Sequence, residues 1–482
     1  MTTAGTIGSV DDARRALGEI GQEHVLAFWD ELSADQRDRL LAQIAALDLD
    51  AIPRLAREYV LNKPEPGSAD ALEPHPYFPH SGEGWDPGAM REAGEELIRA
   101  GKVAAFVVAG GQGSRLGYDG PKGEFPATPV SDKPLFRVFA EWIAACRDRY
   151  GCAIPWYVMT SPINHDRTAD FFDRHDYFGL PREDVMFFAQ GVLPSFGMTD
   201  GKLLLAAKGV IATNPDGHGG SLKALWSSGA IDDMRRRGVE HISYFQVDNP
   251  SVRAIDPVFL GLHAAGPGSS AEMSSKVLEK AEPREKVGVI GSLHGKTTVI
   301  EYSDLSDEHA RARDPDGRLR YRLGSIAIHS ISVAFVARLN GDGSGGGFGL
   351  PLHRAEKKVP HVDIDTGDPV EPDEPNAVKL ETFVFDALPF AKGSVVYETD
   401  RVEEFAPIKN AEGADSPASS RLLQTERAAR WLEAAGVDVP RTTEGEPDCS
   451  IEIAPSTAMG PDDLRGLDDL PARVERGGRL VI

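Results

Sequence analysis

A short apolar run that ends in glycines constrains this chain more than any other feature of its sequence. Residues 103–109 are Val-Ala-Ala-Phe-Val-Val-Ala, and Gly110, Gly111 and Gly113 follow at once. A run of this length and β-branched content is too short for a buried helix and is typical of a strand in a parallel sheet. Glycines tolerate positive φ and leave backbone amides uncovered, so the turn after this strand can approach an anion closely.

Two cations, Arg115 and Lys122, stand just beyond the glycines. Uncovered amides followed by cations suit the phosphates of a nucleoside triphosphate at the carboxyl end of a first strand. The turn is not a dinucleotide-binding fingerprint, because Leu116 stands where its last glycine is required, and it is not a Walker loop, because Lys122 comes too late after Gly113. We predict a phosphate site here. The alternative is a tight turn that only lets a helix pack on the sheet.

The sequence from residue 103 to about residue 396 alternates between strand-like and helical segments. We expect strands over 154–160 and 241–247, and helices over 134–146 and 221–237. This alternation predicts an α/β fold with a doubly wound sheet, whose ligand site lies at the carboxyl ends of the strands. Strands added in antiparallel fashion are expected over 273–277, 287–290 and 297–302.

Weaker patterns flank this region on both sides. Helical periodicity over 10–61 predicts a helical layer packed on a larger domain, with a capping box at Ser33 and Gln36. The run 341–349 is glycine-rich without a cation, so we expect a flexible loop. A helix is expected over 419–435. These patterns divide the chain into an N-terminal helical segment (1–97), a central domain (98–398) and a small C-terminal domain or lid (399–482).

Charge and cysteine content exclude several classes of protein. The 482 residues include 52 Lys and Arg against 75 Asp and Glu, a net charge of −23, which argues against general nucleic-acid or anionic-membrane binding. The three cysteines have no metal-ligand spacing, which predicts reduced thiols in a cytoplasmic protein. No apolar run approaches the length of a membrane span, and no export signal is recognisable at the start.

A second glycine-rich turn, residues 214–220, precedes the helix expected from Ser221. Gly217 and Gly219 would let the backbone pass close to a flat ligand, and His218 offers a ring for hydrogen bonding or stacking. The alternative is a helix start in which the glycines serve only the turn.

A carboxylate follows the strand expected over 241–247. Asp248 would lie at the ligand-binding edge of the sheet, where a hard oxygen ligand suits Mg²⁺. The alternative is a capping aspartate. Lys357, Lys358 and Lys409 are basic residues in an acidic protein, although each alone is more often a surface lysine. No Ser/His/Asp or Cys/His spacing indicates a catalytic nucleophile, and no pair of histidines suggests zinc.

Many further motifs recur in a fixed order between residues 103 and 410. They include Pro121-Lys-Gly123, Gln190-Gly-x-Leu-Pro194, Pro215-Asp-Gly-His-Gly-Gly220, Val247-Asp-Asn249, Val277-x-Glu-Lys280, Lys379-x-Glu-x-Phe-Val-Phe-Asp386 and Phe405-x-Pro-Ile-Lys-Asn410. With these motifs the chain resembles the eukaryotic-type UDP-sugar pyrophosphorylases, and most closely the UDP-N-acetylhexosamine pyrophosphorylases.

The resemblance implies a uridylyltransferase that uses Mg²⁺ and makes UDP-sugar and pyrophosphate from UTP and a sugar 1-phosphate. It also implies a Rossmann-like mixed sheet of the nucleotide-diphospho-sugar transferase type over 98–398. In the family's scheme Arg115, Lys122 and Lys409 act on the phosphates and Asp248 binds the metal. The nucleotide-binding positions are Gly110, Gly111, Gly113, Gln190, Gly217 and His218, and the sugar-binding positions are Gly288, Glu301, Ser325, Phe383 and Phe385.

Two departures from the hexosamine pattern concern the sugar. The hexosamine enzymes usually have Asn at the position of His218, where a histidine is similar to the glucose-type enzymes, and they usually have two more amide side chains within 324–329. Loss of those amides removes groups that a polar pocket uses for discrimination. A glucose-type or broad sugar specificity is therefore an alternative, as is a non-catalytic UDP-sugar-binding protein. A nicotinamide-dependent dehydrogenase would rest on the glycines alone.

Overall fold

The computed structural model describes residues 7–63, 71–341 and 349–482. The chain forms two compact units: a smaller one of Met1–Gly67, Gly191–Gly220 and Leu350–Val384, and a larger one of Ser68–Gln190, Ser221–Gly349 and Phe385–Ile482. The three-part division expected from the sequence stays a prediction. The loop predicted at 341–349 lies, except for its two end residues, outside the described residues.

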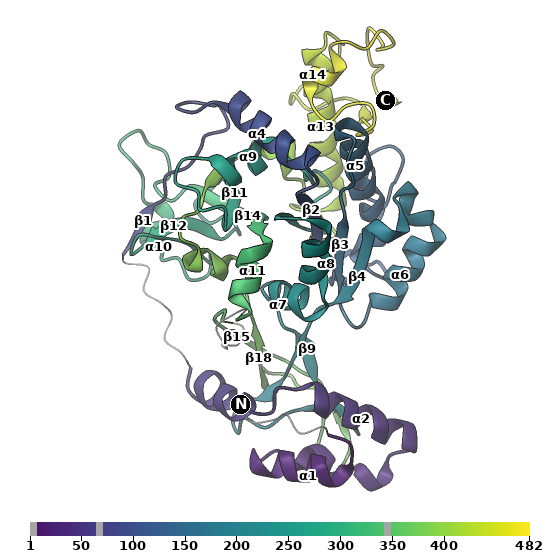
Figure 1. The fold of residues 1–482 in the computed structure, drawn as a ribbon, viewed down its shortest axis with the longest axis vertical. Coiled ribbons are helices and arrows are strands. Elements are labelled where there is room, and N and C mark those ends of the chain that lie inside the picture. Colours follow the sequence, from purple (N-terminus) through teal and green to yellow (C-terminus); the bar gives the residue numbers. More distant parts are fainter. Residues whose placement is uncertain (1–6, 64–70, 342–348) are drawn as a thin grey trace. The chain divides into compact units, whose positions relative to one another are not determined.

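The larger unit is built on a 10-stranded mixed sheet, drawn in Figure 1. The predicted first strand, β2, pairs in parallel with β3 and β10, and β4 pairs in parallel with β3. The prediction of an α/β fold with a central mixed sheet is confirmed. In spatial order the main path is β1 (Leu72–Pro74), β12 (Val289–Leu293), β14 (Leu323–Ser332), β10 (His241–Gln246), β2 (Val103–Val108), β3 (Trp156–Thr160) and β4 (Val185–Ala189).

The antiparallel additions expected from the sequence are also present. Strand β14 runs antiparallel to β10 and β12, and β11 (Met273–Glu279) pairs antiparallel with β14. Strand β13 (Lys296–Ile300) forms an antiparallel pair with β12, and β19 (Val396–Glu398) lies parallel to β11. These strands extend the sheet on the side away from β4.

Helices cover both faces of the parallel strands. On one face Trp156 of β3 contacts Phe136 of α5 (Leu135–Tyr150) and Phe172 of α6 (His165–Arg174). The next residue along β3, Tyr157, points to the other face, where its hydroxyl donates to Asp233 of α8 (Ala230–Arg237) at 2.6 Å. Successive side chains of a strand point to opposite faces, so the sheet is wound on both sides as predicted.

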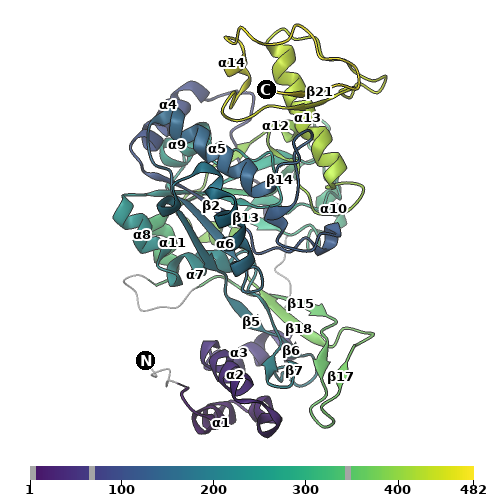
Figure 2. The same cartoon turned by 90° about the vertical axis from the view of Figure 1, so that its right-hand side faces the viewer.

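Other helices of the larger unit differ in detail from the expectation. The helical segment expected over 221–237 is two helices, α7 (Gly220–Ser227) and α8, because Gly229 between them adopts a φ of 80°. Helices α4 (Pro87–Arg99) and α9 (Pro257–Ala265) lie side by side in Figures 1 and 2. A Cβ at Gly94 or Gly261 would lie 1.8 Å from the carbonyl oxygen of the facing helix, so this close packing requires glycine. The remaining α-helices described in this unit before residue 341 are α10 (Asp307–Arg311) and α11 (Val333–Leu339).

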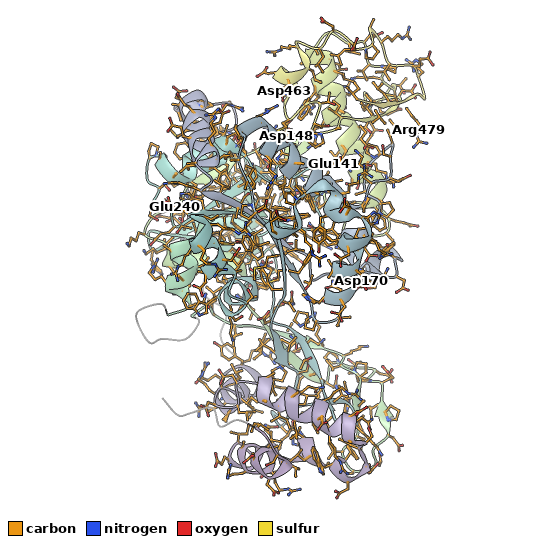
Figure 3. The ribbon with its side chains drawn as sticks, turned by 45° about the vertical axis from the view of Figure 1, so that its right-hand side comes forward. Glu141, Asp148, Asp170, Glu240, Asp463 and Arg479 are labelled. Atoms are coloured by element: carbon orange, nitrogen blue, oxygen red, sulfur yellow. The ribbon has the colours of Figure 1, made fainter. Side chains whose placement is uncertain are left out.

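The last part of the chain packs around its own small core. The predicted helix is α13 (Pro417–Ala434), which Ser416 caps, and its Trp431 and Leu432 pack with Ile451 and Leu464. The other elements here are α12 (Arg401–Glu404), β20 (Ser450–Glu452), α14 (Pro461–Leu464) and β21 (Arg479–Val481), with β20 parallel to β21. Figure 3 labels Asp463 and Arg479 in this part and Glu141 on α5.

The N-terminal helices belong to the smaller unit (Figure 2). The capping box predicted at Ser33 and Gln36 is confirmed at the start of α2. These helices pack on segments far along the chain: the side chain of Gln22 bonds the backbone of Gly201 and Leu203. The α-helices and strands described in this unit are α1 (Val10–Glu19), α2 (Ala34–Ala46), α3 (Ile52–Leu55), β5 (Val192–Pro194), β6 (Phe196–Gly197), β7 (Leu205–Ala207), β8 (Val210–Ile211), β9 (Thr213–Pro215), β15 (His353–Lys357), β16 (His361–Val362), β17 (Pro369–Val370) and β18 (Ala377–Glu381).

Among the described residues, no helix is both long enough and apolar enough to cross a membrane.

Candidate functional site

The glycine loop that follows β2 folds back on itself. The amide of Gly113 donates to the carbonyl of Gly120 at 2.8 Å, and the amide of Lys122 donates to the carbonyl of Gly111 at 3.0 Å. Within the described part of the chain, the amides of Gly110 and Gly111 donate to no acceptor. The loop therefore presents two uncovered amides beside the end of the first strand, as an anion site requires.

Space rather than backbone conformation explains Gly110 and Gly113, whereas a Cβ at Gly111 would meet nothing within 4 Å. The positive φ expected at Gly110, Gly111 and Gly113 is absent from all three, whereas Gly120 later in the loop has a φ of 152°. A Cβ at Gly110 would lie 2.5 Å from Oε1 of Gln190. The structure thus brings Gln190, predicted to bind the nucleotide, directly against the start of the loop.

The two predicted phosphate cations differ in how firmly they are held. Arg115 lies on the exposed short helix η4 (Ser114–Leu116) and forms no ion pair with any described residue. Lys122 begins the short helix η5 (Lys122–Glu124), and its half-buried Nζ donates to the carbonyl of Ile408 at 3.3 Å. Arg115 is therefore available to an anion, and Lys122 is directed toward a segment far along the chain.

Asp248 lies at the carboxyl end of β10, as predicted. In the parallel pairing of β10 with β2, Gln246 lies beside Val108. Asp248 and Gly110 each come two residues later, so both lie just beyond the carboxyl ends of these neighbouring strands. The side chain of Asp248 forms no hydrogen bond or ion pair within the described residues, which leaves both carboxylate oxygens available. An unengaged carboxylate beside the glycine loop argues against the capping alternative.

Residues 404–409 run alongside Asp248. The amide of Ile408 donates to the carbonyl of Asp248 at 2.8 Å. The side chain of Asn249 bonds two backbone groups of the same segment, at 2.8 and 3.1 Å. Lys409 directly follows Ile408, so the predicted phosphate lysines and the predicted metal ligand are all tied to this one segment.

The side chain of Lys409 is only weakly engaged. Its Nζ lies 3.3 Å from a carboxylate oxygen of Asp415, and both side chains are more than one-third exposed. An exposed ion pair of this kind contributes little stability. A phosphate could therefore replace Asp415 as the partner of Lys409 at small cost.

The side chains at the carboxyl ends of the strands fit an Mg²⁺ ion that is bound mainly by substrate phosphates. Among the described residues, no group of three His, Cys, Asp or Glu side chains is placed to hold a metal ion. Magnesium in nucleotide enzymes is commonly bound by one or two carboxylates together with substrate phosphates and water. Asp248 can supply one such carboxylate.

Three of the five predicted sugar residues lie together at the β12–β14 side of the sheet. The amide of Ser325 donates to the carbonyl of Gly288 at 2.7 Å. A Cβ at Gly288 would lie 3.7 Å from Oε1 of Glu301. In the same stretch of β14, Ala327 adopts a φ of 55° within a bulge, so the departure from the hexosamine pattern at 324–329 falls in an irregular part of the strand.

The other predicted positions are divided between the units. Phe385 is buried in the larger unit, on the short helix η8 (Val384–Phe390). Gly217, His218 and Phe383 belong to the smaller unit, where the rings of His218 and Phe383 stack with centroids 5.2 Å apart. The ring of His353 stacks on Phe383 as well, at 4.3 Å.

His218 is held in its neutral form. Burial, with a smaller contribution from nearby His353, lowers the pKa of His218 to about 4. The amide of Val384 donates to its Nδ1 at 3.1 Å, so Nδ1 is the acceptor and the proton resides on Nε2. The ring is therefore neutral at neutral pH and carries its proton on Nε2.

The glycines beside His218 admit another stretch of backbone. Gly217 has a φ of 85°, and a Cβ there would lie 2.3 Å from the carbonyl oxygen of Thr382. A Cβ at Gly219 would lie 2.7 Å from backbone atoms of Phe383. The close approach that these glycines allow is to residues 382–383, which favours the structural explanation for the glycines themselves. Lys357 and Lys358, also in this unit, are exposed.

Sequence reasoning missed a buried ion cluster that supports the 404–409 segment. Lys276 of β11 is fully buried, and its Nζ lies 2.5 Å from both a carboxylate oxygen of Asp256 and one of Glu404. The hydroxyl of Thr399 donates to Glu404 at 2.9 Å. A lysine inside an apolar strand was the one available signal, since buried lysines are almost always paired.

Comparison with known proteins identifies the family of this chain. Residues 88–431 match the model of the family described as UTP–glucose-1-phosphate uridylyltransferase. The chain is 38% identical to the human protein named UDP-N-acetylhexosamine pyrophosphorylase-like protein 1, with 93% of each chain covered. It is 35% identical to the UDP-N-acetylglucosamine pyrophosphorylase of Saccharomyces cerevisiae, over 89% of this chain and 92% of the yeast one.

Solved structures show the same fold. The uridine diphosphate N-acetylglucosamine pyrophosphorylase of Trypanosoma brucei superposes with a TM-score of 0.81 at 26% identity, covering 98% of both chains. A UDP-glucose pyrophosphorylase of Leishmania major has a TM-score of 0.61 at 14% identity, covering 94% of this chain and 98% of the other, and shows the fold alone. On the match over 88–431 and the relatives above 30% identity, the chain belongs to the UTP–glucose-1-phosphate uridylyltransferase family.

Proposed function

We propose that this protein transfers a uridylyl group from UTP to a sugar 1-phosphate, releasing pyrophosphate and UDP-sugar. A phosphate oxygen of the sugar 1-phosphate bonds to the α-phosphorus of UTP in line as the bond to the pyrophosphate oxygen breaks. This displacement requires no covalent protein nucleophile, only positioning and neutralisation of charge. The observation that carries the proposal is the attachment of Lys122, Asp248 and Lys409 to one segment beside two uncovered glycine amides.

The glycine loop has the chemistry to hold the phosphates of UTP. The amides of Gly110 and Gly111 donate to phosphate oxygens, and Arg115 and Lys122 neutralise the charge that grows on the departing pyrophosphate. Lys409, released from Asp415, contacts the phosphate of the sugar. Asp248 would hold Mg²⁺, which supplies further neutralisation of phosphate charge when it is bound.

The nucleoside is assigned to Gln190, Gly217 and His218. The neutral ring of His218 offers its Nε2 proton to an acceptor such as a carbonyl oxygen of uracil. A charged imidazolium would be disfavoured there by the same burial that lowers its pKa. The role of His218 therefore depends on hydrogen bonding rather than on charge.

The sugar is assigned to Gly288, Glu301, Ser325, Phe383 and Phe385. We propose N-acetylglucosamine 1-phosphate or a related hexose 1-phosphate, since the human relative is named for UDP-N-acetylhexosamine and the yeast relative for UDP-N-acetylglucosamine. The second candidate is a glucose-type or broad specificity, favoured by His218 and by the missing amides within 324–329.

The cysteines concern the compartment. All three are free thiols, as is typical of the reducing cytoplasm, where we place the reaction.

A substrate panel tests the proposal. Purified protein is incubated with UTP, Mg²⁺ and separate sugar 1-phosphates, and released pyrophosphate is measured. We expect turnover with at least one hexose or N-acetylhexosamine 1-phosphate, and no turnover with any of them would refute the proposal. Tight UDP-sugar binding by calorimetry without exchange of labelled pyrophosphate would instead favour a non-catalytic binding protein.

A further inference from the structure

A buried carboxylate lies at the end of the glycine loop, two residues after Lys122. Glu124 is the last residue of η5, and its side chain is only 4% exposed. The guanidinium of Arg167 donates to both of its oxygens, through Nε at 3.2 Å and Nη2 at 2.9 Å. The hydroxyl of Tyr118 donates to the same carboxylate at 3.3 Å. The charge of Glu124 is thus matched by one arginine from another element.

The same guanidinium also holds the loop backbone. Nη2 of Arg167 donates to the carbonyl of Asp119 at 2.7 Å. A Cβ at Gly120 would lie 2.1 Å from Nη2, so the absence of a side chain there makes room for the guanidinium. Arg167 therefore bonds the residues on both sides of Pro121 and Lys122.

Arg167 comes from α6, whose N-terminal end holds the other end of the loop too. Asn164, the residue before α6, is buried, and its Nδ2 donates to the carbonyl of Ala109 at 3.2 Å. Asn164 and Arg167 are three residues apart and lie on the same face of the helix start. Figure 3 labels Asp170 one turn further along this helix. The first turn of α6 thus forms hydrogen bonds with the residue before Gly110 and with residues on both sides of Lys122.

We propose that Arg167 is a positioning residue for the phosphate-binding loop, with Asn164 holding the loop's start and the Arg167–Glu124 pair holding its end. The inference rests on the proposed function, because it assigns the loop to the phosphates of UTP. Fork-like bonding to a carboxylate and a carbonyl fixes orientation as well as distance. Arg167 itself need not touch substrate: it sets where Lys122 and the glycine amides stand.

The test separates the nucleotide from the sugar. In Arg167→Met the loop loses its end anchor, so we expect KM for UTP to rise at least about tenfold while KM for the sugar 1-phosphate changes less than about twofold. Arg174→Met, on the exposed side of the same helix, is the matched control and should leave both values unchanged. A UTP KM for Arg167→Met within about twofold of the wild-type value would overturn the proposal.

Two more variants keep the test decisive if Arg167→Met folds poorly. Arg167→Lys retains the charge but cannot bond Asp119 and both oxygens of Glu124, so we expect an intermediate UTP KM. The double variant Arg167→Met with Glu124→Gln removes the unpaired buried carboxylate, so it should be less impaired than Arg167→Met alone. If the fold-increase in UTP KM of the double variant equals the product of the fold-increases in Arg167→Met and Glu124→Gln, the two side chains do not act as a unit, which would contradict the proposed pair.

Failure of the two proposals can be told apart. If the wild-type protein releases no pyrophosphate, the proposed function fails, and UTP affinity is then measured by calorimetry for wild type, Arg167→Met and Arg174→Met. Weaker binding in Arg167→Met alone supports the positioning role. Equal affinities in all three proteins, or no UTP binding by any of them, overturn it.

Discussion

The glycine loop of the larger unit and the 214–220 turn of the smaller unit are both glycine-rich, yet their glycines serve different purposes. At Gly110 and Gly111 the amides are left uncovered and cations follow. At Gly217 and Gly219 the missing side chains admit the backbone of 382–383, and the neighbouring histidine is kept neutral. One region is built for charge and the other for close packing and a neutral donor.

The two regions are also stabilised differently. The charged region depends on buried carboxylates with a cation partner: Glu404 with the fully buried Lys276, and Glu124 with Arg167, whose side chain is 45% exposed. The neutral region depends on stacked rings and on backbone contact. Removal of one member of a buried ion pair leaves an uncompensated charge, so single substitutions should be most damaging in the charged region.

The largest expected effect is that of Lys276→Met. The variant leaves the buried carboxylates of Asp256 and Glu404 without their cation, so the free energy of unfolding should fall by about 3–5 kcal/mol. Urea unfolding measures it. Lys392→Met is the control, because that ammonium belongs to a side chain 81% exposed and should change stability by less than about 0.5 kcal/mol. Equal stability of the two variants would contradict a role for buried charge.

The next largest effect concerns activity rather than stability. Asp248→Asn should lower kcat/KM by at least about 10²-fold, because the amide cannot supply the charge that Mg²⁺ and the phosphates require. The free energy of unfolding should hardly change, since the Asp248 carboxylate bonds nothing else within the described residues. Pyrophosphate release measures the rate, and exposed Asp170→Asn is the control. A wild-type rate for Asp248→Asn would refute the metal assignment.

Gly217→Ala tests the packed region. A Cβ there would clash with the carbonyl of Thr382, and the backbone has a φ of 85°, which an alanine rarely adopts. The free energy of unfolding should therefore fall by about 2–3 kcal/mol. Gly21→Ala in the same unit has a φ of 67° with nothing within 4 Å of the added Cβ, so it isolates the backbone cost of about 1 kcal/mol. Similar losses in the two variants, by chemical denaturation, would show that the contact with Thr382 does not matter.

The smallest expected effect is a pH dependence of stability. His218 has a folded-state pKa of about 4, below its ordinary value of 6.5, so the unfolded chain takes up a proton first on acidification. The stabilisation is complete above pH 6.5 and is lost as the pH falls from 6.5 toward 4, with a loss of about 2 kcal/mol by pH 5. We expect the difference in unfolding free energy between wild type and His218→Gln to change by that amount from pH 7 to 5. A constant difference would contradict a neutral, buried ring.

Much of the fold could be predicted because its signals are local. The run 103–109 is apolar at every position, which is what a strand covered on both faces requires, and the capping box at Ser33 and Gln36 is contained in four residues. The two-helix break at Gly229 was missed because a single glycine can also sit inside a helix. No local pattern in the sequence indicated that residues 10–61 form one unit with residues 191–220 and 350–384.

The sequence by itself determined the predicted strands, the glycine-rich turn after the first of them with Arg115 and Lys122 beyond it, and the position of Asp248 just after a strand. These features depend on residues that are neighbours in the sequence. Only the tertiary structure decided that residues 404–409 lie against Asp248, that Arg167 pairs with Glu124, and that Lys276 is buried between two carboxylates. These contacts join residues tens to more than a hundred positions apart. Their free energy depends on desolvation and geometry that no single stretch of chain contains.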